Sequence, residues 1–233
     1  MSTPVRDPGR RRRAPRGLGD QLREDILDAT TELLLETGQA KAVSIRSVAQ
    51  RVGVTPPSIY LHFVDKDALL DAVCARYFEK LDEEMQRAAD GQTTTLDVFR
   101  AQGLAYVRFA VQTPELYRIA TMGEGTPGSD VDLTLTSSAF QHMRVSVQAL
   151  MDEGIFVRED PTKVALAMWT AAHGVAALLI AKPYLPWGDV EEFTDRVLRA
   201  VCAGQIVNGL VGQDARPEDV IDWLFTRGAQ QDE

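Results

Sequence analysis

The sequence predicts an all-α fold in which a long helix joins a small N-terminal helical domain to a larger C-terminal helical domain. Of its 233 residues, 45% are hydrophobic but only 7% are aromatic, and Ala, Leu and Val are abundant, a balance that favours helices. No run of β-branched residues alternates with polar ones as a strand requires. This length and apolar content suffice to bury a sizeable core.

Charge divides the chain into a basic head and an acidic body. Residues 1–66 carry 11 Lys/Arg and 8 Asp/Glu, a net of +3, whereas the remaining residues carry 14 and 26, a net of −12. This asymmetry predicts that only the head meets a polyanion. The predicted boundaries are a disordered basic arm at 1–18, an N-terminal domain at 19–66 and a C-terminal domain at 67–233. The arm either adds to polyanion binding or is only a solvated tail.

Helical spacing of apolar residues, with capping residues at the ends, defines each predicted helix in order. Asp20, Ser44 and Asp65 are predicted N-caps, and Gly38 and Gly53 are predicted helix ends. The predicted helices cover 20–38, 45–52, 56–62, 66–89, 95–112, 114–121, 133–153, 161–182, 189–209 and 217–226, with a mobile loop at 122–130.

The second and third helices form a predicted helix-turn-helix. Ala49 lies four residues before Gly53, where a small side chain lets the two helices approach and glycine takes a positive φ. Ile59 supplies the apolar side chain that packs the third helix onto the second. An ordinary hairpin in a core is the alternative, but it would not expose the polar side chains that the third helix carries.

Two prolines, Pro56 and Pro57, stand at the start of the third helix. First-turn N–H groups have no internal partner, so proline removes nothing there, and its fixed φ stiffens the helix start. Thr55 is predicted to cap this helix. Because Pro57 disfavours the α region for the residue before it, a start at Pro57 stays open beside a start at Pro56. Two apolar rings at an exposed helix start suit contact with a thymine methyl in the major groove of DNA.

The segment from Ser44 to Leu70, S-I-R-S-V-A-Q-R-V-G-V-T-P-P-S-I-Y-L-H-F-V-D-K-D-A-L-L, resembles the DNA-binding region of TetR-family transcriptional regulators. The likeness extends back to about residue 20. The resemblance implies an all-helical homodimer that binds a palindromic operator in double-stranded DNA and usually represses. It also implies a small-molecule effector that binds the C-terminal domain and releases the operator. The same fold acting as an activator, or without an effector, stays open.

Positions that match the family's motif give the expected DNA contacts. Arg46 matches a base-reading position, where arginine bonds a guanine edge through two parallel hydrogen bonds. The expected DNA-binding residues are Ser44 and Arg46, then Pro56, Pro57 and Ser58 at base-facing positions, and Thr55, Tyr60, His62 and Lys66 at phosphate contacts. For Tyr60 and His62 the alternative is packing between helices.

The helix over 161–182 is apolar on nearly every face, which predicts a helix buried on all sides rather than a membrane span, with one side in its own domain and another against a partner. Within it, W-x-x-x-H-G-x-x-x-L resembles a pattern of one C-terminal subclass of the same family. We expect a mostly apolar effector pocket. The candidate ligand-binding residues are Tyr106, Phe109, Tyr117, Met122, His142, Met143, Trp169 and His173, each with a role in the core as its alternative.

Small residues on the helix over 189–209 predict a dimer interface. Ala200, Ala203 and Gly204 permit close approach of a symmetry mate, so that two helices from each subunit form a four-helix interface. Cys74 and Cys202 fit no metal-ligand spacing and indicate either a reducing compartment or simply buried thiols, and a cytoplasmic protein is expected.

Enzymatic and cofactor-dependent functions are not predicted. None of the three histidines lies three residues after a glutamate, as a di-metal carboxylate bundle requires. No phosphate-binding loop, zinc spacing or nucleophile motif occurs, so neither a cofactor nor a metal is expected. A helical adaptor that binds only protein is a more distant alternative, because it would not need exposed Arg46, Tyr60 and Lys66 around a rigid helix start.

Overall fold

The computed structural model describes residues 18–122, 136–212 and 214–231, and every regular element within these ranges is a helix. The predicted all-α class is therefore confirmed. The chain divides between Val73 and Cys74 into two compact units, called here the N-terminal unit and the C-terminal unit. Residues 1–17 of the predicted arm, and the predicted loop from residue 123 onward, lie outside the described residues. Leu18 and Met122, predicted in the arm and the loop, are instead helical.

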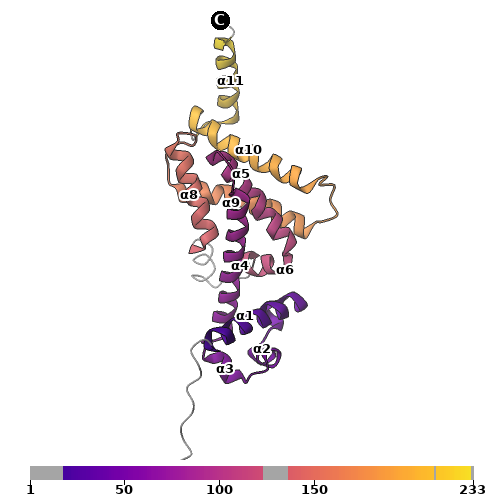
Figure 1. Ribbon diagram of the computed structural model, residues 1–233. Coiled ribbons are helices and arrows are strands. Elements are labelled where there is room, and N and C mark those ends of the chain that lie inside the picture. The colour runs from indigo at the N-terminus through magenta and orange to yellow at the C-terminus, as the bar shows by residue number, and fades with distance from the viewer. Residues whose placement is uncertain (1–17, 123–135, 213, 232–233) are drawn as a thin grey trace, which may run out of the picture. The chain divides into compact units, whose positions relative to one another are not determined.

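The elements follow one another in the order drawn in Figure 1. The N-terminal unit contains α1 (Leu18–Thr37), the 3-10 helix η1 (Ala40–Ala42), α2 (Ile45–Val52), α3 (Pro56–Tyr60) and the start of α4 (Lys66–Ala89). The C-terminal unit contains the rest of α4, then α5 (Thr95–Gln112), α6 (Pro114–Met122), α8 (Ser138–Asp152), α9 (Pro161–Ala181), α10 (Val190–Val211) and α11 (Pro217–Gln231).

Two predicted details of the first and third helices are wrong. α1 begins at Leu18, so Asp20 lies in the first turn rather than at the N-cap. In the first turn its carboxylate still interacts favourably with the helix dipole. α3 ends at Tyr60 instead of residue 62, because the carbonyl of Ile59 accepts from the N–H groups of both His62 and the residue after it, which closes the helix.

Two further helix ends differ from prediction or cannot be compared. α11 continues to Gln231, beyond the predicted end at 226. The predicted start of the helix at 133 lies outside the described residues, and within them α8 begins at Ser138 with the Ser137 side chain accepting from the N–H of Phe140. That capping bond fixes where α8 starts.

The N-terminal unit is built around large apolar side chains that are almost fully buried. Ile26 and Leu34 of α1, Val48 of α2 and Ile59 of α3 are each 0% exposed. The turn between α2 and α3 has the predicted geometry: Gly53 adopts φ 80° and ψ 30°, and the N–H groups of Gly53 and the next residue both donate to the carbonyl of Ala49. The helix-turn-helix is thus fixed by backbone bonds and by one buried isoleucine.

Replacing Gly53 by alanine should destabilise the N-terminal unit. The added Cβ meets no atom within 4 Å, so the cost of about 1 kcal/mol comes from the left-handed backbone alone. Native-state hydrogen exchange of the α2 amides measures it as faster local opening. Gly53→Asn is the matched control, because asparagine tolerates this conformation, and it should recover part of the loss. Equal protection in the alanine variant and the parent would contradict this account.

In the C-terminal unit, α9 packs against α5, α8 and α10, and α5 packs against α8 and α10. One apolar cluster contains Tyr77, Leu81, Tyr106 and Tyr117, and a second contains Phe140, Leu150, Phe156 and Met168. Four helices therefore meet around a shared interior.

Among the described helices, α9 is long and apolar enough to cross a membrane by composition, and 39% of its most apolar window is buried. A core helix of a folded domain passes the same test. α9 contacts three other helices of its unit but leaves Leu166 36% and Leu178 53% exposed. In one protomer α9 is thus buried on one side, and burial of its other side against a partner stays a prediction.

Candidate nucleic-acid interface and ligand cavity

The leading end of α3 is presented to solvent on a rigid base. Thr55, Pro56 and Pro57 are exposed, Ser58 is half-buried and Tyr60 is 53% exposed. The helix starts at Pro56, which resolves the two possible starts in favour of the first proline. The single buried side chain of α3, Ile59, holds it against α2.

Thr55 occupies the N-cap position, but its side chain does not cap as predicted. Both prolines lack an N–H, and the first available one, on Ser58, donates to the backbone carbonyl of Thr55 at 2.8 Å. The Thr55 hydroxyl instead lies 3.1 Å from the Ser58 hydroxyl. The two hydroxyls therefore form a polar pair beside the exposed proline rings.

The start of α2 carries the other expected DNA contacts. Ser44 is the N-cap, and its hydroxyl accepts from the N–H of Ser47 while the Ser47 hydroxyl accepts from the Ser44 N–H, which forms a capping box. Arg46, two residues after Ser44, is exposed and makes no ion pair with the described residues. Its guanidinium is thus available for an external acceptor.

Neighbouring cations of the N-terminal unit are engaged. Arg51 pairs with Glu32 at 3.1 Å and with Glu36 at 2.6 Å, which joins α2 to α1, and the hydrogen bond from Arg51 lowers the pKa of Glu36. Lys66 is half-buried, and its Nζ donates to the carbonyl of Ala40 at 2.7 Å. Lys66 therefore fixes η1 at the start of α4 in addition to any contact with phosphate.

Two exposed apolar side chains beside this surface were not assigned to DNA contact from the sequence. Leu61 is 84% exposed and Val64 is 79% exposed, directly after α3. The residue spacing could have predicted this exposure. Ile59 and Phe63 are four residues apart and lie on the buried face, so Leu61 and Val64 must lie away from that face. His62 is half-buried between them.

The C-terminal unit encloses a cavity of about 420 Å³, within the range of small-molecule sites. It lies among the four packed helices and receives one side chain from α4. The apolar lining includes Met85 of α4, Phe99 and Tyr106 of α5, Met143 of α8, Met168 and Trp169 of α9, and Leu198 and Val201 of α10. Three methionines give this wall soft, adaptable side chains.

Three of the eight predicted ligand residues, Tyr106, Met143 and Trp169, line this cavity. The structure does not place the other five in its lining. Phe109 packs against Tyr77, with ring centroids 5.2 Å apart. Met122, the last residue of α6, is 42% exposed. His142 lies on α8 with its Nδ1 2.7 Å from the Asp82 carboxylate.

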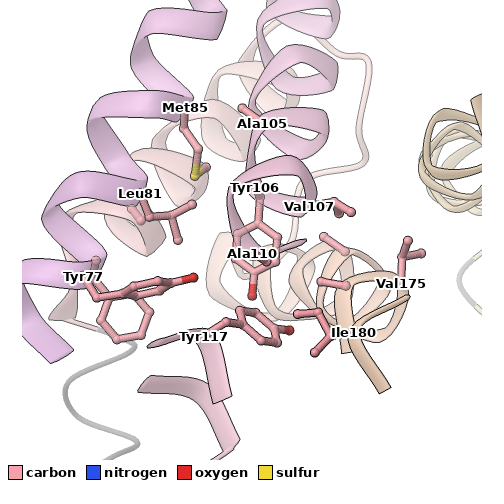
Figure 2. Close-up of a cluster of buried hydrophobic side chains, with 14 of the residues drawn as sticks. Tyr77, Leu81, Met85, Ala105, Tyr106, Val107, Ala110, Tyr117, Val175 and Ile180 are labelled. Carbon is pink, nitrogen blue, oxygen red and sulfur yellow. The ribbon is translucent and has the colours of Figure 1, made fainter. Parts of the chain in front are cut away.

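Tyr117 and His173 lie in a buried polar network behind the cavity wall. The Tyr117 hydroxyl is 2.7 Å from His173 Nδ1, and Trp169 Nε1 donates to the Tyr106 hydroxyl at 3.0 Å. Figure 2 shows the tyrosines of this region converging from α4, α5 and α6. Burial raises the pKa of Tyr106 and Tyr117 and lowers that of His173, so the network is uncharged at neutral pH.

Charged residues stand at the mouth of the cavity. Arg100 and Arg199 are exposed, and both guanidinium groups bind the carboxylate of Asp195, at 2.5 Å and 2.9 Å. Arg100 is the main cause of the lowered pKa of Asp195. Two cations share one anion here, whereas the interior is apolar. In the part of the chain that the structure describes, no three His, Cys, Asp or Glu side chains are grouped to hold a metal ion.

Two protein-family models match the chain. The model for bacterial regulatory proteins of the tetR family matches residues 26–73, which include α2 and α3. The model for the tetracyclin repressor-like C-terminal domain matches residues 99–201, which include most of the cavity lining. The two matches thus fall on the exposed helix-turn-helix and on the helices around the cavity.

Similar proteins are known from several bacteria. The nucleoid occlusion factor SlmA of Vibrio cholerae is 30% identical over 97 residues, and the chain spans only 50% of its length, with 42% of this chain matched. The tetracycline repressor protein class D of Escherichia coli is 45% identical over 51 residues, 22% of this chain and 23% of that protein. A solved structure of a protein with unknown function from Rhodococcus sp. RHA1 is 25% identical with a TM-score of 0.69, over 83% of this chain and 100% of that one.

Proposed function

Because the chain belongs to the TetR family of bacterial transcriptional regulators, we propose that it is a cytoplasmic repressor that binds a palindromic operator as a homodimer and releases it on binding a small apolar molecule. Members of this family are DNA-binding transcription factors, so the chain is a regulator and not an enzyme. The N-terminal unit carries the DNA-binding helix-turn-helix, and the cavity of the C-terminal unit is the proposed effector site.

The observation that carries the proposal is the exposed leading end of α3. A helix that only completed a core would bury this end, whereas here Thr55, Pro56 and Pro57 are exposed over a buried Ile59. Such a helix start enters a major groove with its first residues at the base edges. Arg46, exposed and without an ion pair among the described residues, supplies a side chain that matches guanine.

Release of the operator follows from the course of α4. This helix begins at Lys66 in the N-terminal unit and supplies Met85 to the wall of the cavity. A ligand that displaces Met85 would move α4 and change the spacing of the two recognition helices in a dimer. A difference of a few kcal/mol in ligand affinity between the two states is enough to empty the operator.

In vitro selection of DNA bound by the purified protein tests the proposal. A palindromic consensus with two half-sites is expected, because a two-fold symmetric dimer reads the same sequence twice. Enrichment of a single asymmetric site, or no enrichment at all, would contradict it. Titration of apolar compounds against the selected operator then tests whether occupancy of the cavity releases DNA.

Arg46→Ala should relax the selected consensus at one position in each half-site, with a loss of about 1–3 kcal/mol of discrimination against other bases. Lys66→Ala should instead weaken binding to all sequences about equally, because Lys66 is proposed to contact phosphate, which carries no sequence information. Competition binding with operators mutated one position at a time measures both effects. If both variants change affinity without changing base preference, Arg46 does not read a base.

A further inference from the structure

Among the described residues that line the cavity, Gln102 is the one with a side-chain amide. We propose that Gln102 donates a hydrogen bond to the effector, an inference that rests on the proposed effector function of that cavity. The effector is then an uncharged, largely apolar molecule that carries a carbonyl-type oxygen.

Gln102 is buried, and its side chain makes one hydrogen bond with another described residue. Gln102 lies on α5 and is 4% exposed. Its Oε1 accepts from the hydroxyl of Ser146 on α8 at 3.0 Å, and Ser146 is 9% exposed. No other acceptor among the described residues takes the Ser146 proton. This requirement fixes the amide orientation, with oxygen toward Ser146 and nitrogen away from it.

The amide nitrogen of Gln102 is a donor without an acceptor among the described residues. The Nε2 of Gln102 makes no hydrogen bond with the described residues, although the side chain is more than nine-tenths buried. The nitrogen is not sealed within the core, and the cavity is the space that Gln102 lines. A buried donor without a partner costs free energy, so the site favours a ligand that brings an acceptor.

The neighbouring polar side chains of the cavity already bind other groups of the protein. The hydroxyl of Tyr106 accepts from Trp169 Nε1, and His173 Nδ1, 3.5 Å away, is the acceptor that its own proton faces, so Tyr106 and Trp169 present mainly ring surface to the cavity. Arg100 and Arg199 stand exposed at the mouth and are both bound to Asp195. Within the described lining, the amide of Gln102 is therefore the free N–H donor at depth, and the thiol of Cys202 is only a weak donor.

The apolar wall of the cavity favours an uncharged ligand. The wall around Gln102 consists of Phe99, Met143, Met168 and other apolar side chains. A carboxylate buried there would lose its hydration and gain only one neutral donor in return, which is unfavourable. A ketone, ester or amide oxygen matches one buried amide N–H without that cost.

Two probes of the same shape test the proposal: benzophenone, which has a carbonyl, and 1,1-diphenylethylene, in which a methylene replaces that oxygen. The intact protein should bind benzophenone about fivefold more tightly, as one neutral hydrogen bond provides. The carbonyl stretch of bound benzophenone should shift to lower frequency, which reports the bond directly. Calorimetry measures affinity, and infrared difference spectroscopy measures the stretch.

The matched variants separate a lost donor from a damaged core. Gln102→Met combined with Ser146→Ala removes both polar partners at similar volume, so neither is left unpaired. The double variant should bind both probes equally and abolish the shift of the carbonyl stretch. Ser146→Ala alone keeps the amide nitrogen and should keep the preference for benzophenone. Circular dichroism confirms that each variant is folded before binding is compared.

The proposal is overturned if the intact protein binds both probes equally, binds neither, or if the double variant keeps the preference and the shift. Failure of the effector function has a different signature. Benzophenone would then bind with the Gln102-dependent preference and yet leave operator affinity unchanged. That result would refute ligand-controlled release while leaving Gln102 as the hydrogen-bond donor of the cavity.

Discussion

Replacing Pro57 by glutamate is expected to lower affinity for the selected operator about 100-fold, since like charges brought together at an interface cost several kcal/mol. Pro57 is exposed at the second position of α3, on the end that we propose enters the major groove. A carboxylate there would face phosphates and acceptor-rich base edges. The protein itself should stay folded, because an acidic residue in the first turn of a helix interacts favourably with the helix dipole.

Fluorescence anisotropy at one fixed salt concentration measures the loss, and thermal unfolding followed by circular dichroism checks the fold. Leu35→Glu is the matched control: Leu35 is 46% exposed on α1, so the same charge enters the same unit on a different helix from α3. The control should change affinity only slightly. Equal losses in both variants would mean that net charge, and not the position of α3, controls binding, and the assigned recognition surface would be wrong.

Local signals were sufficient to predict the helices of the N-terminal unit. The predicted bounds of α4 were correct because Asp65 is a capping residue, and its carboxylate accepts from the N–H of Ala68 at 2.7 Å. Gly53 marked the turn because only a left-handed residue fits there. The predicted cap by the Thr55 side chain was wrong, because its backbone carbonyl already binds the only N–H that the two prolines leave in reach.

The ligand cavity could not be predicted with the same success, because it depends on how four distant helices pack. Tyr106 and Tyr117 are both aromatic residues on neighbouring helices, yet one lines the cavity and the other is 0% exposed beside His173. In the sequence, Gln102 does not differ from other polar residues of α5. Only the fold shows that the hydroxyl of Ser146, on another helix, donates to its oxygen. Residue type therefore indicated an apolar pocket, but only tertiary packing assigns its members.

The arginines of the N-terminal unit show where better sequence reasoning was possible. Arg46 and Arg51 lie on the same short helix, and only the first was assigned to DNA. Glu32 and Glu36 are four residues apart on α1, so they form one acidic face, and both bind Arg51. That spacing was readable in the sequence and would have predicted that Arg51 is engaged within the protein.

Replacing Gly204 by glutamate is expected to convert the proposed dimer to a monomer and to lower operator affinity about 1,000-fold, toward the level of non-specific binding. Gly204 lies on the exposed face of α10 with Ala200 and Ala203, and a Cβ at this position meets no atom within 4 Å in one protomer. The substitution should therefore leave the protomer folded, and it raises helix propensity by up to about 1 kcal/mol.

The effect instead arises across the two-fold axis. In a symmetric interface each substitution occurs twice on the same surface, so two carboxylates would be brought together where small residues now permit close contact. Analytical ultracentrifugation measures the oligomeric state, and anisotropy measures operator affinity. Val145→Glu is the matched control, because Val145 is 58% exposed on α8 and not on α10, and this variant should stay dimeric. A Gly204→Glu protein that remains a dimer would exclude α10 from the interface, whereas a monomer that kept full operator affinity would show that one recognition helix suffices.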